Sequence, residues 1–396
     1  MQFVFHNPTK VYFGTDQLKN LPLELKHFGT RVLLVYGGGS IKKNGLYDEI
    51  LKLCNENHLK IFELAGVEPN PRHTTVNRGV ALCRKEHVDV ILAVGGGSSI
   101  DCAKGIAATV HAATDNVWDL VEHKSEIKEA LPLVTVLTLA ATGSEMDTGA
   151  VISNMNLNVK SGLIHEKIRP QVSFEDPTVT STVNAYQTAS GSVDIITHIL
   201  DVAYLSAQPQ MEMLRNIQEE VMRSVIKFTR IALTTPDSFE ARSNLMWASS
   251  WALNDFMYCG VAQSPILHAI EHELSAHYDI THGHGLAILT PPFLRYALNK
   301  DPQCASVIAR WGQQCLGVTP RKNDLTTAQE AAKAVDKIYF DEFGLKRHLR
   351  DLNIDDSKFE IMAHACCNGL FAPDHKLHGL IDLDESDVVE ILKLSL

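Results

Sequence analysis

The chain has 396 residues and 45% of them are hydrophobic, which is enough to bury a large core and to form two domains. The formal net charge of −11 disfavours a nucleic-acid partner, because a phosphate backbone is repelled by an acidic surface. No apolar run reaches the length of a transmembrane helix, and the N-terminus lacks the basic and apolar regions of a signal peptide. The eight cysteines form no C-x-x-C pair and indicate buried thiols in a reducing compartment. We therefore expect a cytoplasmic globular protein without a membrane partner.

The first half of the chain alternates apolar runs with helical patterns. Its opening segment, QFVFHNPTKVYFG, is predicted to form a hairpin at the edge of a sheet. Continuous apolar runs at 32–36, 60–64, 88–94 and 133–139 suit strands that are buried on both faces, as in a parallel sheet. Amphipathic segments such as TTVNRGVALCRKE lie between the runs. This alternation predicts a doubly wound α/β domain.

Strand signals nearly vanish after about Pro177. Residues 211–233, 241–258 and 326–343 carry apolar side chains at helical spacing. We therefore predict an α/β domain over residues 1–180 and an all-helical domain over 181–396. A cleft between two domains is a common place for a ligand, so we expect the site there.

Two of the predicted strands end in similar glycine-rich turns, YGGGSIKKNG at Tyr36–Gly45 and GGGSSIDCAK at Gly95–Lys104. Such turns bring the backbone close to a ligand, and the helix that follows offers free N–H groups to a phosphate. Neither turn has P-loop or strict G-x-G-x-x-G spacing, and a single turn of this kind is often only a tight turn. Two in one sheet favour a ligand that carries phosphate.

The first turn also bears on the choice of a dinucleotide. Enzymes that prefer the unphosphorylated form usually place Asp or Glu near the adenosine ribose. Here Gly38, Gly39 and Ser40 are followed by Lys42 and Lys43, which leaves room and positive charge for a 2′-phosphate. The alternative is that both lysines are merely solvated helix surface.

The second half concentrates acids and histidines at helical spacing. Asp194 and His198 are four residues apart and share one helix face, and His268 and His272 repeat the spacing. His282 follows fourteen residues after His268. A lone helical histidine is more often a hydrogen-bonded core or surface residue, but one carboxylate with several imidazoles suits Zn²⁺ or Fe²⁺.

Several segments spread along the chain match one known family: FHNPTKVYFG, YGGGSIKKNG, VEPNP, AVGGGSSIDCAKGIA, LTLAATGSEM, SGSVDIITHILD, LHAIEHELSAHYDITHGHGLAI and EILKL. Through them the chain resembles, nearly from end to end, the iron-containing (group III) alcohol dehydrogenases, and within them the butanol dehydrogenase-like aldehyde reductases. The resemblance implies the dehydroquinate synthase-like fold of that family, with a dinucleotide-binding α/β domain and a helical metal-binding domain. It also implies hydride transfer between a nicotinamide cofactor and a primary alcohol or aldehyde such as butanol or butanal.

The resemblance also implies the site residues. One divalent metal, Fe²⁺ or Zn²⁺, is expected on Asp194, His198, His268 and His282, with His272 as a catalytic group near the nicotinamide. The expected cofactor-binding residues are Gly37, Gly38, Gly39, Ser40, Asn70, Gly95, Gly96, Gly97, Ser98, Asp101, Thr138, Thr142 and Lys160. From the residues of the first glycine-rich turn, we expect NADP(H) to be preferred over NAD(H).

Some details depart from the family's commoner pattern and leave the substrate open. His284 stands where a small residue is more usual, and we expect it to face solvent. A glycerol dehydrogenase-like polyol oxidoreductase and a dehydroquinate synthase-like lyase are the alternative enzymes, although the apolar segment WALNDFMYCG disfavours a phosphorylated polyacid substrate. A metal-stabilised scaffold is the non-enzyme alternative. An edge strand at the N-terminus favours a homodimer.

Overall fold

The computed structural model describes residues 2–206, 210–261, 263, 265–369, 372 and 374–396. The chain divides into two compact units. The α/β unit comprises His6–Val183 and Pro236–Asn254, and the helical unit comprises Met1–Phe5, Asn184–Thr235 and Asp255–Leu396. The predicted boundary at 180/181 lies close to the change of unit after Val183, but the prediction did not include the return of 236–254 to the α/β unit.

The α/β unit is built on a six-stranded sheet in the order β1-β8-β5-β4-β2-β3. Its strands are β1 (Lys10–Phe13), β2 (Arg31–Tyr36), β3 (Lys60–Ala65), β4 (Val90–Gly95), β5 (Leu133–Leu137) and β8 (Val172–Glu175). Every neighbouring pair is parallel, so all the carboxyl ends lie at one edge of the sheet. The four strands predicted from continuous apolar runs are all present.

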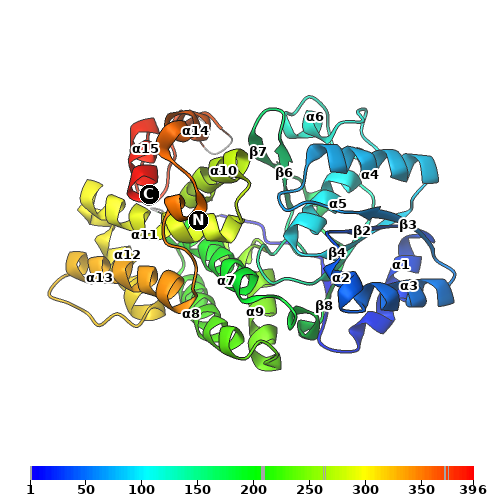
Figure 1. Ribbon diagram of the computed structural model, residues 1–396, viewed down its shortest axis with the longest axis horizontal. Helices are drawn as coiled ribbons and strands as arrows, with labels where there is room; N and C mark the ends of the chain where they lie inside the picture. Colours follow the sequence, from blue (N-terminus) through cyan, green and yellow to red (C-terminus); the bar gives the residue numbers. More distant parts are fainter. Residues whose placement is uncertain (1, 207–209, 262, 264, 370–371, 373) are drawn as a thin grey trace. The chain divides into compact units, whose positions relative to one another are not determined.

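Helices cover both faces of this sheet, as Figure 1 shows. Side chains of Leu33, Val35 and Ile91 pack in the core under α4 (His73–Glu86), α5 (Gly97–Thr109) and α6 (Val117–Val121). The alternate strand residues, such as Val32, Leu34 and Val90, pack in a second core under α1 (Leu21–Phe28) and α3 (Leu46–Glu56). Because both faces are buried, the strands are continuously apolar. The doubly wound α/β prediction is confirmed.

The predicted N-terminal hairpin is wrong. β1 instead pairs in parallel with β8, with Lys10 opposite Val172, and the ring of Tyr12 stacks on that of Phe174 at 4.8 Å. Residues 2–9 contain no strand, and Pro8 removes one backbone donor that a hairpin ladder would use. The antiparallel hairpin of this unit is formed by β6 (Gly149–Asn154) and β7 (Val159–Ile164), which apolar patterning did not single out.

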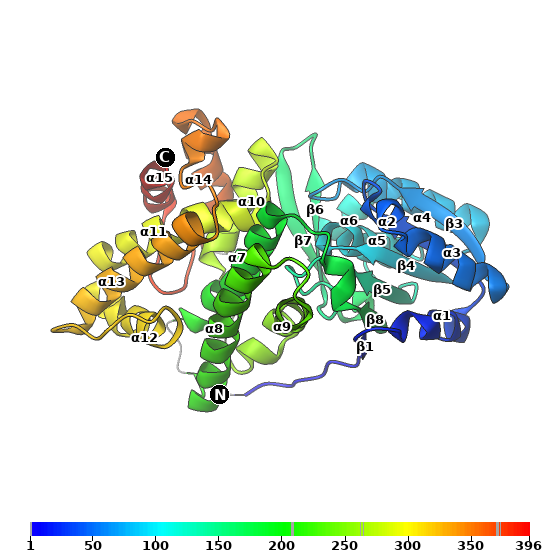
Figure 2. The same ribbon diagram turned by 60° about the horizontal axis from the view of Figure 1, so that its bottom comes forward.

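The helical unit contains α7 (Ala185–Ile199), α8 (Glu212–Thr234), α10 (Ile266–Tyr278), α11 (His282–Lys300), α12 (Ala305–Cys315), α13 (Asp324–Asp336), α14 (Phe359–Cys367) and α15 (Glu385–Leu394). Helix α11 packs against both α7 and α10, as Figure 2 shows. The π-helical segment η4 (Leu200–Tyr204) continues α7 directly, and a second, η7 (Lys337–Glu342), follows α13. The remaining long helix, α9 (Phe239–Ala252), belongs to the α/β unit.

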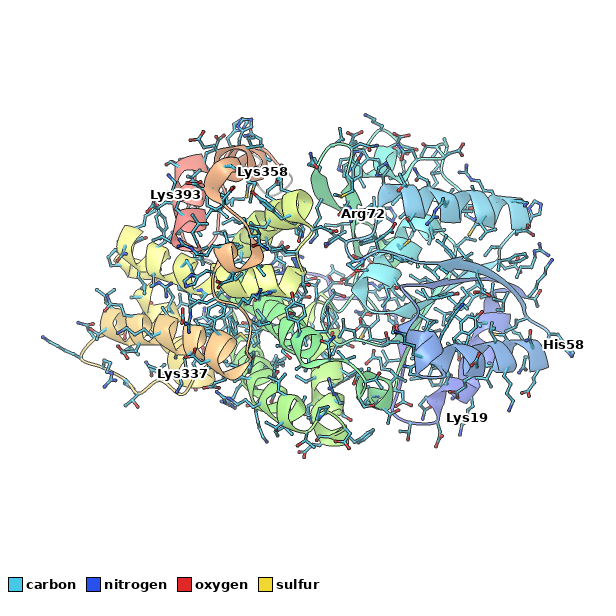
Figure 3. All side chains as sticks on the ribbon, in the orientation of Figure 1. Lys19, His58, Arg72, Lys337, Lys358 and Lys393 are labelled. Carbon is cyan, nitrogen blue, oxygen red and sulfur yellow. The ribbon has the colours of Figure 1, made fainter. Side chains whose placement is uncertain are left out.

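Charged side chains mostly lie on the outside of each unit. Lys19, His58 and Lys393 project outward from the ribbon in Figure 3, whereas Lys104 is fully buried and pairs with the carboxylate of Asp147. Among the described residues, no helix combines the length and apolar character that crossing a membrane requires.

Candidate metal and cofactor sites

The second glycine-rich turn lies at the carboxyl edge of the parallel sheet, where strand β4 ends and helix α5 begins. Gly96 is the N-cap of α5 and has no side chain to occupy the free N–H groups of the first turn. At Gly97 an added Cβ would lie 2.4 Å from Thr142 Cγ2, so only glycine allows the Thr142 segment to approach this helix start. The N–H of Thr138 donates to Gly95 O at 3.0 Å and holds the end of β5 beside the turn. The structure therefore brings the predicted residues Gly95–Ser98, Thr138 and Thr142 together.

The first glycine-rich turn follows the neighbouring strand β2. Gly39 has a φ of 100° and is the N-cap of the four-residue helix α2 (Ser40–Lys43). A Cβ on Gly38 or Gly39 would meet nothing within 4 Å, so this loop is open, as the sequence predicted. The ammonium of Lys42 lies over the rings of Tyr36 and Tyr47, at 5.1 and 4.3 Å from their centroids. Both lysines are exposed, and Lys42 differs from Lys43 in lying over these two rings.

The other predicted cofactor residues differ in how they are placed. Both carboxylate oxygens of Asp101 accept hydrogen bonds, one from Ser144 Oγ at 2.6 Å and one from Val151 N at 2.9 Å. Burial raises the pKa of Asp101 to about 6. Lys160 is buried on β7, and Asn70 lies in the loop after β3 with a φ of 52°. Asp101 thus ties helix α5 to the hairpin that carries Lys160.

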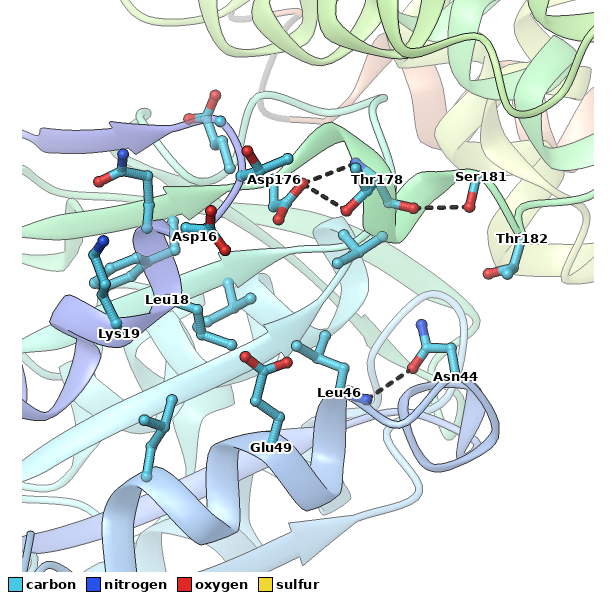
Figure 4. Close-up of a pocket in the computed structure, with 18 residues that line it drawn as sticks. Asp16, Leu18, Lys19, Asn44, Leu46, Glu49, Asp176, Thr178, Ser181 and Thr182 are labelled. Atoms are coloured by element: carbon cyan, nitrogen blue, oxygen red, sulfur yellow. Dashed lines mark hydrogen bonds between the residues drawn. The ribbon is translucent and has the colours of Figure 1, made fainter. Parts of the chain in front are cut away.

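A separate pocket of about 610 Å³ opens in the α/β unit beside helix α3 (Figure 4). Its walls include Asp16 and Lys19 after β1, Asn44 and Glu49 at the start of α3, and Thr178 after β8. Its volume is in the range of small-molecule sites. Among the described residues that line it, none is a predicted cofactor residue. Sequence reasoning missed this pocket because its walls come from separated segments of the chain.

The predicted metal residues meet in the helical unit. One ligand atom from each of Asp194, His268 and His282 lies within 4.8 Å of the other two. Asp194 comes from α7, His268 from α10 and His282 from the first residue of α11. A Cβ on Gly283 would lie 2.0 Å from Ser190 O, so this glycine lets α11 approach α7 beside Asp194.

His198 lies beside this group. Its Nε2 is 3.7 Å from Asp194 Oδ1, and its ring stacks on that of His268 with centroids 4.8 Å apart. Burial lowers the pKa of His198 well below the usual range, and the nearby His268 and His282 lower it further. A neutral imidazole is the form that binds a metal.

Two carboxylates that the sequence analysis did not select each contact the Nδ1 atom of a predicted metal-binding histidine. His268 Nδ1 contacts Asp201 Oδ2 at 2.9 Å, and His282 Nδ1 contacts Glu271 Oε2. Asp201 and Glu271 are buried. The available signal was spacing, because Asp201 follows His198 by three residues and Glu271 follows His268 by three.

Two further histidines have different surroundings. His272 is buried, and its ring centroid is 5.6 Å from that of His282, so it lies beside the predicted metal residues. The expectation that His284 faces solvent is wrong: it is 1% exposed. Its Nδ1 is 3.1 Å from Tyr186 Oη and its Nε2 is 2.9 Å from Lys346 O, so packing of α11 against α7 encloses it.

The residues present fit a divalent metal. His268 Nε2 is buried and has no hydrogen-bond partner among the described residues, although its Nδ1 is bonded to Asp201. A buried nitrogen lone pair close to a carboxylate oxygen is costly unless a cation or proton joins them. One hard oxygen and two or three imidazoles form a donor set suited to Fe²⁺ or Zn²⁺.

Comparison with known proteins identifies the family of the chain. Residues 8–177 match the family model described as iron-containing alcohol dehydrogenase, and residues 188–396 match the C-terminal model of the Fe-containing alcohol dehydrogenase family. The chain belongs to the iron-containing alcohol dehydrogenase family. Membership implies an oxidoreductase that uses a metal and a nicotinamide cofactor, and it confirms the resemblance seen in the sequence.

Individual relatives lie within the same group. The chain is 45% identical to NADH-dependent butanol dehydrogenase B of Clostridium acetobutylicum, with all of both chains covered. It is 33% identical to the NADPH-dependent aldehyde reductase YqhD of Escherichia coli over 90% of each chain. The crystal structure of NADH-dependent butanol dehydrogenase A from Thermotoga maritima superposes with a TM-score of 0.92 at 36% identity, covering 100% of this chain and 98% of that one. The chain is therefore an alcohol dehydrogenase or aldehyde reductase.

Proposed function

We propose that this enzyme interconverts short primary alcohols and aldehydes, such as butanol and butanal, with NADP(H) as the preferred cofactor. The observation that carries the proposal is the cluster of Asp194, His268 and His282 in the helical unit, with an unpartnered His268 Nε2 among the described residues. The names of the butanol dehydrogenases and of the aldehyde reductase support the substrate class.

In this proposal Asp194, His198, His268 and His282 hold one divalent metal, Fe²⁺ or Zn²⁺. The metal, when bound, supplies Lewis-acid chemistry for an alcohol or carbonyl oxygen. Asp194 contributes the negative charge, and the neutral imidazoles contribute nitrogen lone pairs. His272 is proposed to exchange the reaction's proton with solvent through its ring, since an imidazole titrates near neutral pH.

The glycine turns are proposed to hold the dinucleotide. The N–H groups at the start of α5 would bind the pyrophosphate, because a helix N-terminus favours an anion. Thr138, Thr142 and Lys160 would line the ribose and nicotinamide. A cofactor supplies the hydride chemistry, and these residues supply placement and charge.

The cofactor preference rests on the first turn. No carboxylate stands at positions 38–40, and the space beside Gly38 is open. Such a loop can admit a 2′-phosphate. The names of the relatives divide on this point, since the clostridial enzyme is called NADH-dependent and YqhD is called NADPH-dependent. The ratio of kcat/KM for the two cofactors decides it.

The proposed setting is a cytoplasmic homodimer. All eight cysteines are free and buried, which suits a reducing compartment. β1 stands at the edge of the six-stranded sheet, where a second chain could pair. Sedimentation equilibrium of the purified protein tests the dimer.

The experiment for the function compares wild type with His268→Ala. We expect wild type to retain about one divalent metal per chain and to reduce C2–C6 aldehydes with NADPH. The variant should stay folded but lose most of the metal and the turnover. Stoichiometric metal in folded His268→Ala, measured by elemental analysis, would remove His268 from the ligand set. A wild type that reduces none of the aldehydes would reject the substrate class.

A further inference from the structure

Asp201 makes an unusual set of contacts for a residue outside the predicted metal ligands. It is 3% exposed and lies in the π-helical segment η4 that continues α7. Its Oδ1 accepts the N–H of Leu267 at 3.0 Å. Its Oδ2 accepts the N–H of His268 at 3.0 Å and contacts the ring Nδ1 of the same histidine at 2.9 Å. Both oxygens of one buried carboxylate are thus directed at two consecutive residues.

The two backbone contacts fix where helix α10 begins. The first N–H groups of a helix have no partner within it and require acceptors from elsewhere. The N-cap of α10 is Pro265, which makes no side-chain capping bond. Asp201 supplies two of the missing acceptors from another helix, and a negative charge there is also favoured by the helix dipole. The backbone of His268 is therefore held by the same carboxylate that contacts its ring.

The ring contact fixes the tautomer of His268. A carboxylate accepts but does not donate, so the nitrogen that faces Asp201 must carry the proton. Nδ1 then bears hydrogen and Nε2 bears a lone pair. This Nε2 is the buried atom without a hydrogen-bond partner among the described residues. A ring nitrogen of His268 also lies within 4.8 Å of ligand atoms of Asp194 and His282.

We infer that Asp201 is a positioning residue that locks His268 in the Nδ1–H tautomer and presents Nε2 to a divalent metal. The inference rests on the proposed function for the presence of that metal. Glu271 contacts Nδ1 of His282 in a similar way, and it also accepts a hydrogen bond from Ser275 within its own helix. Asp201 couples the ring of His268, the start of α10 and η4. Such outer partners raise metal affinity by fixing ring orientation.

The first test reads the tautomer directly in metal-free wild-type protein. Ring ¹⁵N NMR, with His268 assigned by its loss in His268→Gln, should show a protonated Nδ1 and an unprotonated Nε2. A protonated Nε2 would overturn the inference. This measurement requires neither metal nor activity, so it stands apart from the proposed function.

The second test is Asp201→Asn, which keeps the shape but replaces one acceptor oxygen by an NH₂ donor. At least one of the three contacts is then lost, and the remaining acceptor carries no charge. We expect Zn²⁺ affinity, measured by chelator competition on folded protein, to fall roughly 10–100-fold. Zn²⁺ affinity within twofold of wild type would overturn the inference.

Asp387→Asn is the matched control. Asp387 is also a buried aspartate of the helical unit, and it contacts Tyr296 and Lys300 in the last turns of α11. Tyr296 is fourteen residues from His282, which is about 21 Å along the helix. This control should lose stability but keep wild-type Zn²⁺ affinity; an equal loss of affinity would assign the Asp201 effect to general destabilisation and overturn the inference. Wild type that binds no divalent metal would reject the proposed function, while the tautomer would still be measured.

Discussion

Substituting Gly283 by alanine tests whether close packing of α11 on α7 sets the metal geometry. An added Cβ would lie 2.0 Å from Ser190 O and 3.3 Å from Asp194 Cβ. An ordinary C···O contact is about 3.3 Å, so α11 must retreat from α7 by roughly 1 Å. The obstacle is a backbone carbonyl within a helix, which cannot rotate away. Since metal–ligand distances tolerate only about 0.2 Å, His282 should leave bonding range of a metal held by Asp194.

Two quantities should therefore change together in Gly283→Ala. Overpacking of this kind costs about 1–3 kcal/mol of unfolding free energy. Zn²⁺ affinity should fall by roughly 10–100-fold or more, since loss of a ligand's outer partner alone costs about that much. The assays are urea unfolding of the metal-free protein and chelator competition at a temperature where the variant is folded.

Gly312→Ala is the control that separates a loss of stability by overpacking from a change in the geometry of the metal site. Its Cβ would lie 2.5 Å from Ala331 Cβ, where α12 packs on α13 in the same unit. We expect a similar loss of stability with Zn²⁺ affinity close to that of wild type. The reasoning is refuted if Gly283→Ala folds with wild-type affinity, or if Gly312→Ala loses as much affinity.

Three further predictions concern the proton, the cofactor and pH. His272→Ala should keep the metal but lose about 10²–10⁴-fold in kcat with an altered pH–rate profile, and a profile like that of wild type would exclude an acid–base role. Gly38→Asp should shift the kcat/KM ratio from NADPH towards NADH, because the new carboxylate repels the 2′-phosphate. Position 38 is chosen because the φ of 100° at Gly39 would strain any side chain at position 39. An unchanged ratio would show that another element selects the cofactor. Burial raises the pKa of Glu145 to about 7, so the folded state keeps a proton that the unfolded chain releases, and stability should fall as pH rises from about 4.5 to about 7. Burial also raises the pKa values of Asp101 and Glu273, so Glu145→Gln should remove only the Glu145 share of that slope, at most about 3 kcal/mol. An undiminished slope in urea unfolding at pH 5 and pH 8 would contradict this.

The sequence predicted the sheet well because both of its faces are buried. A strand enclosed by helices on two sides must be apolar at every position, and runs such as 32–36 and 133–137 have that property. The N-terminal strand was misplaced because its pairing is not local. Residues 10–13 are a short run whose partner, β8, lies about 160 positions away, and a local pattern carries no information on which distant strand will pair with it.

The site was predictable only in part. Spacing alone singled out Asp194 with His198 and His268 with His272 as pairs that share a helix face. The family resemblance implied Asp194, His198, His268 and His282 as the metal ligands. The burial of His284 was not predictable, since its two partners, Tyr186 and the carbonyl of Lys346, are separated from it by 98 and 62 positions. A polar side chain is buried where tertiary contacts satisfy it, and those contacts follow from the fold.

The carboxylate of Asp201, which contacts Nδ1 of His268, shows why helical spacing was informative but did not assign the role of each acidic residue. Seven residues of a regular α-helix return to within about 20° of the same face, so spacing alone would predict Asp201 on the stripe of Asp194, although Asp201 lies in the π-helical segment η4. Spacing alone would make Asp201 a candidate ligand alongside Asp194. The contacts assign it differently, because its oxygens are already directed at the backbone and ring of His268. Asp194 and Asp201 are thus the same residue type about two helical turns apart. Asp194 Oδ1 lies 3.7 Å from Nε2 of His198 and 3.6 Å from Nε2 of His282, whereas Asp201 contacts Nδ1 of His268. This difference separates the proposed metal ligand from the proposed positioning residue.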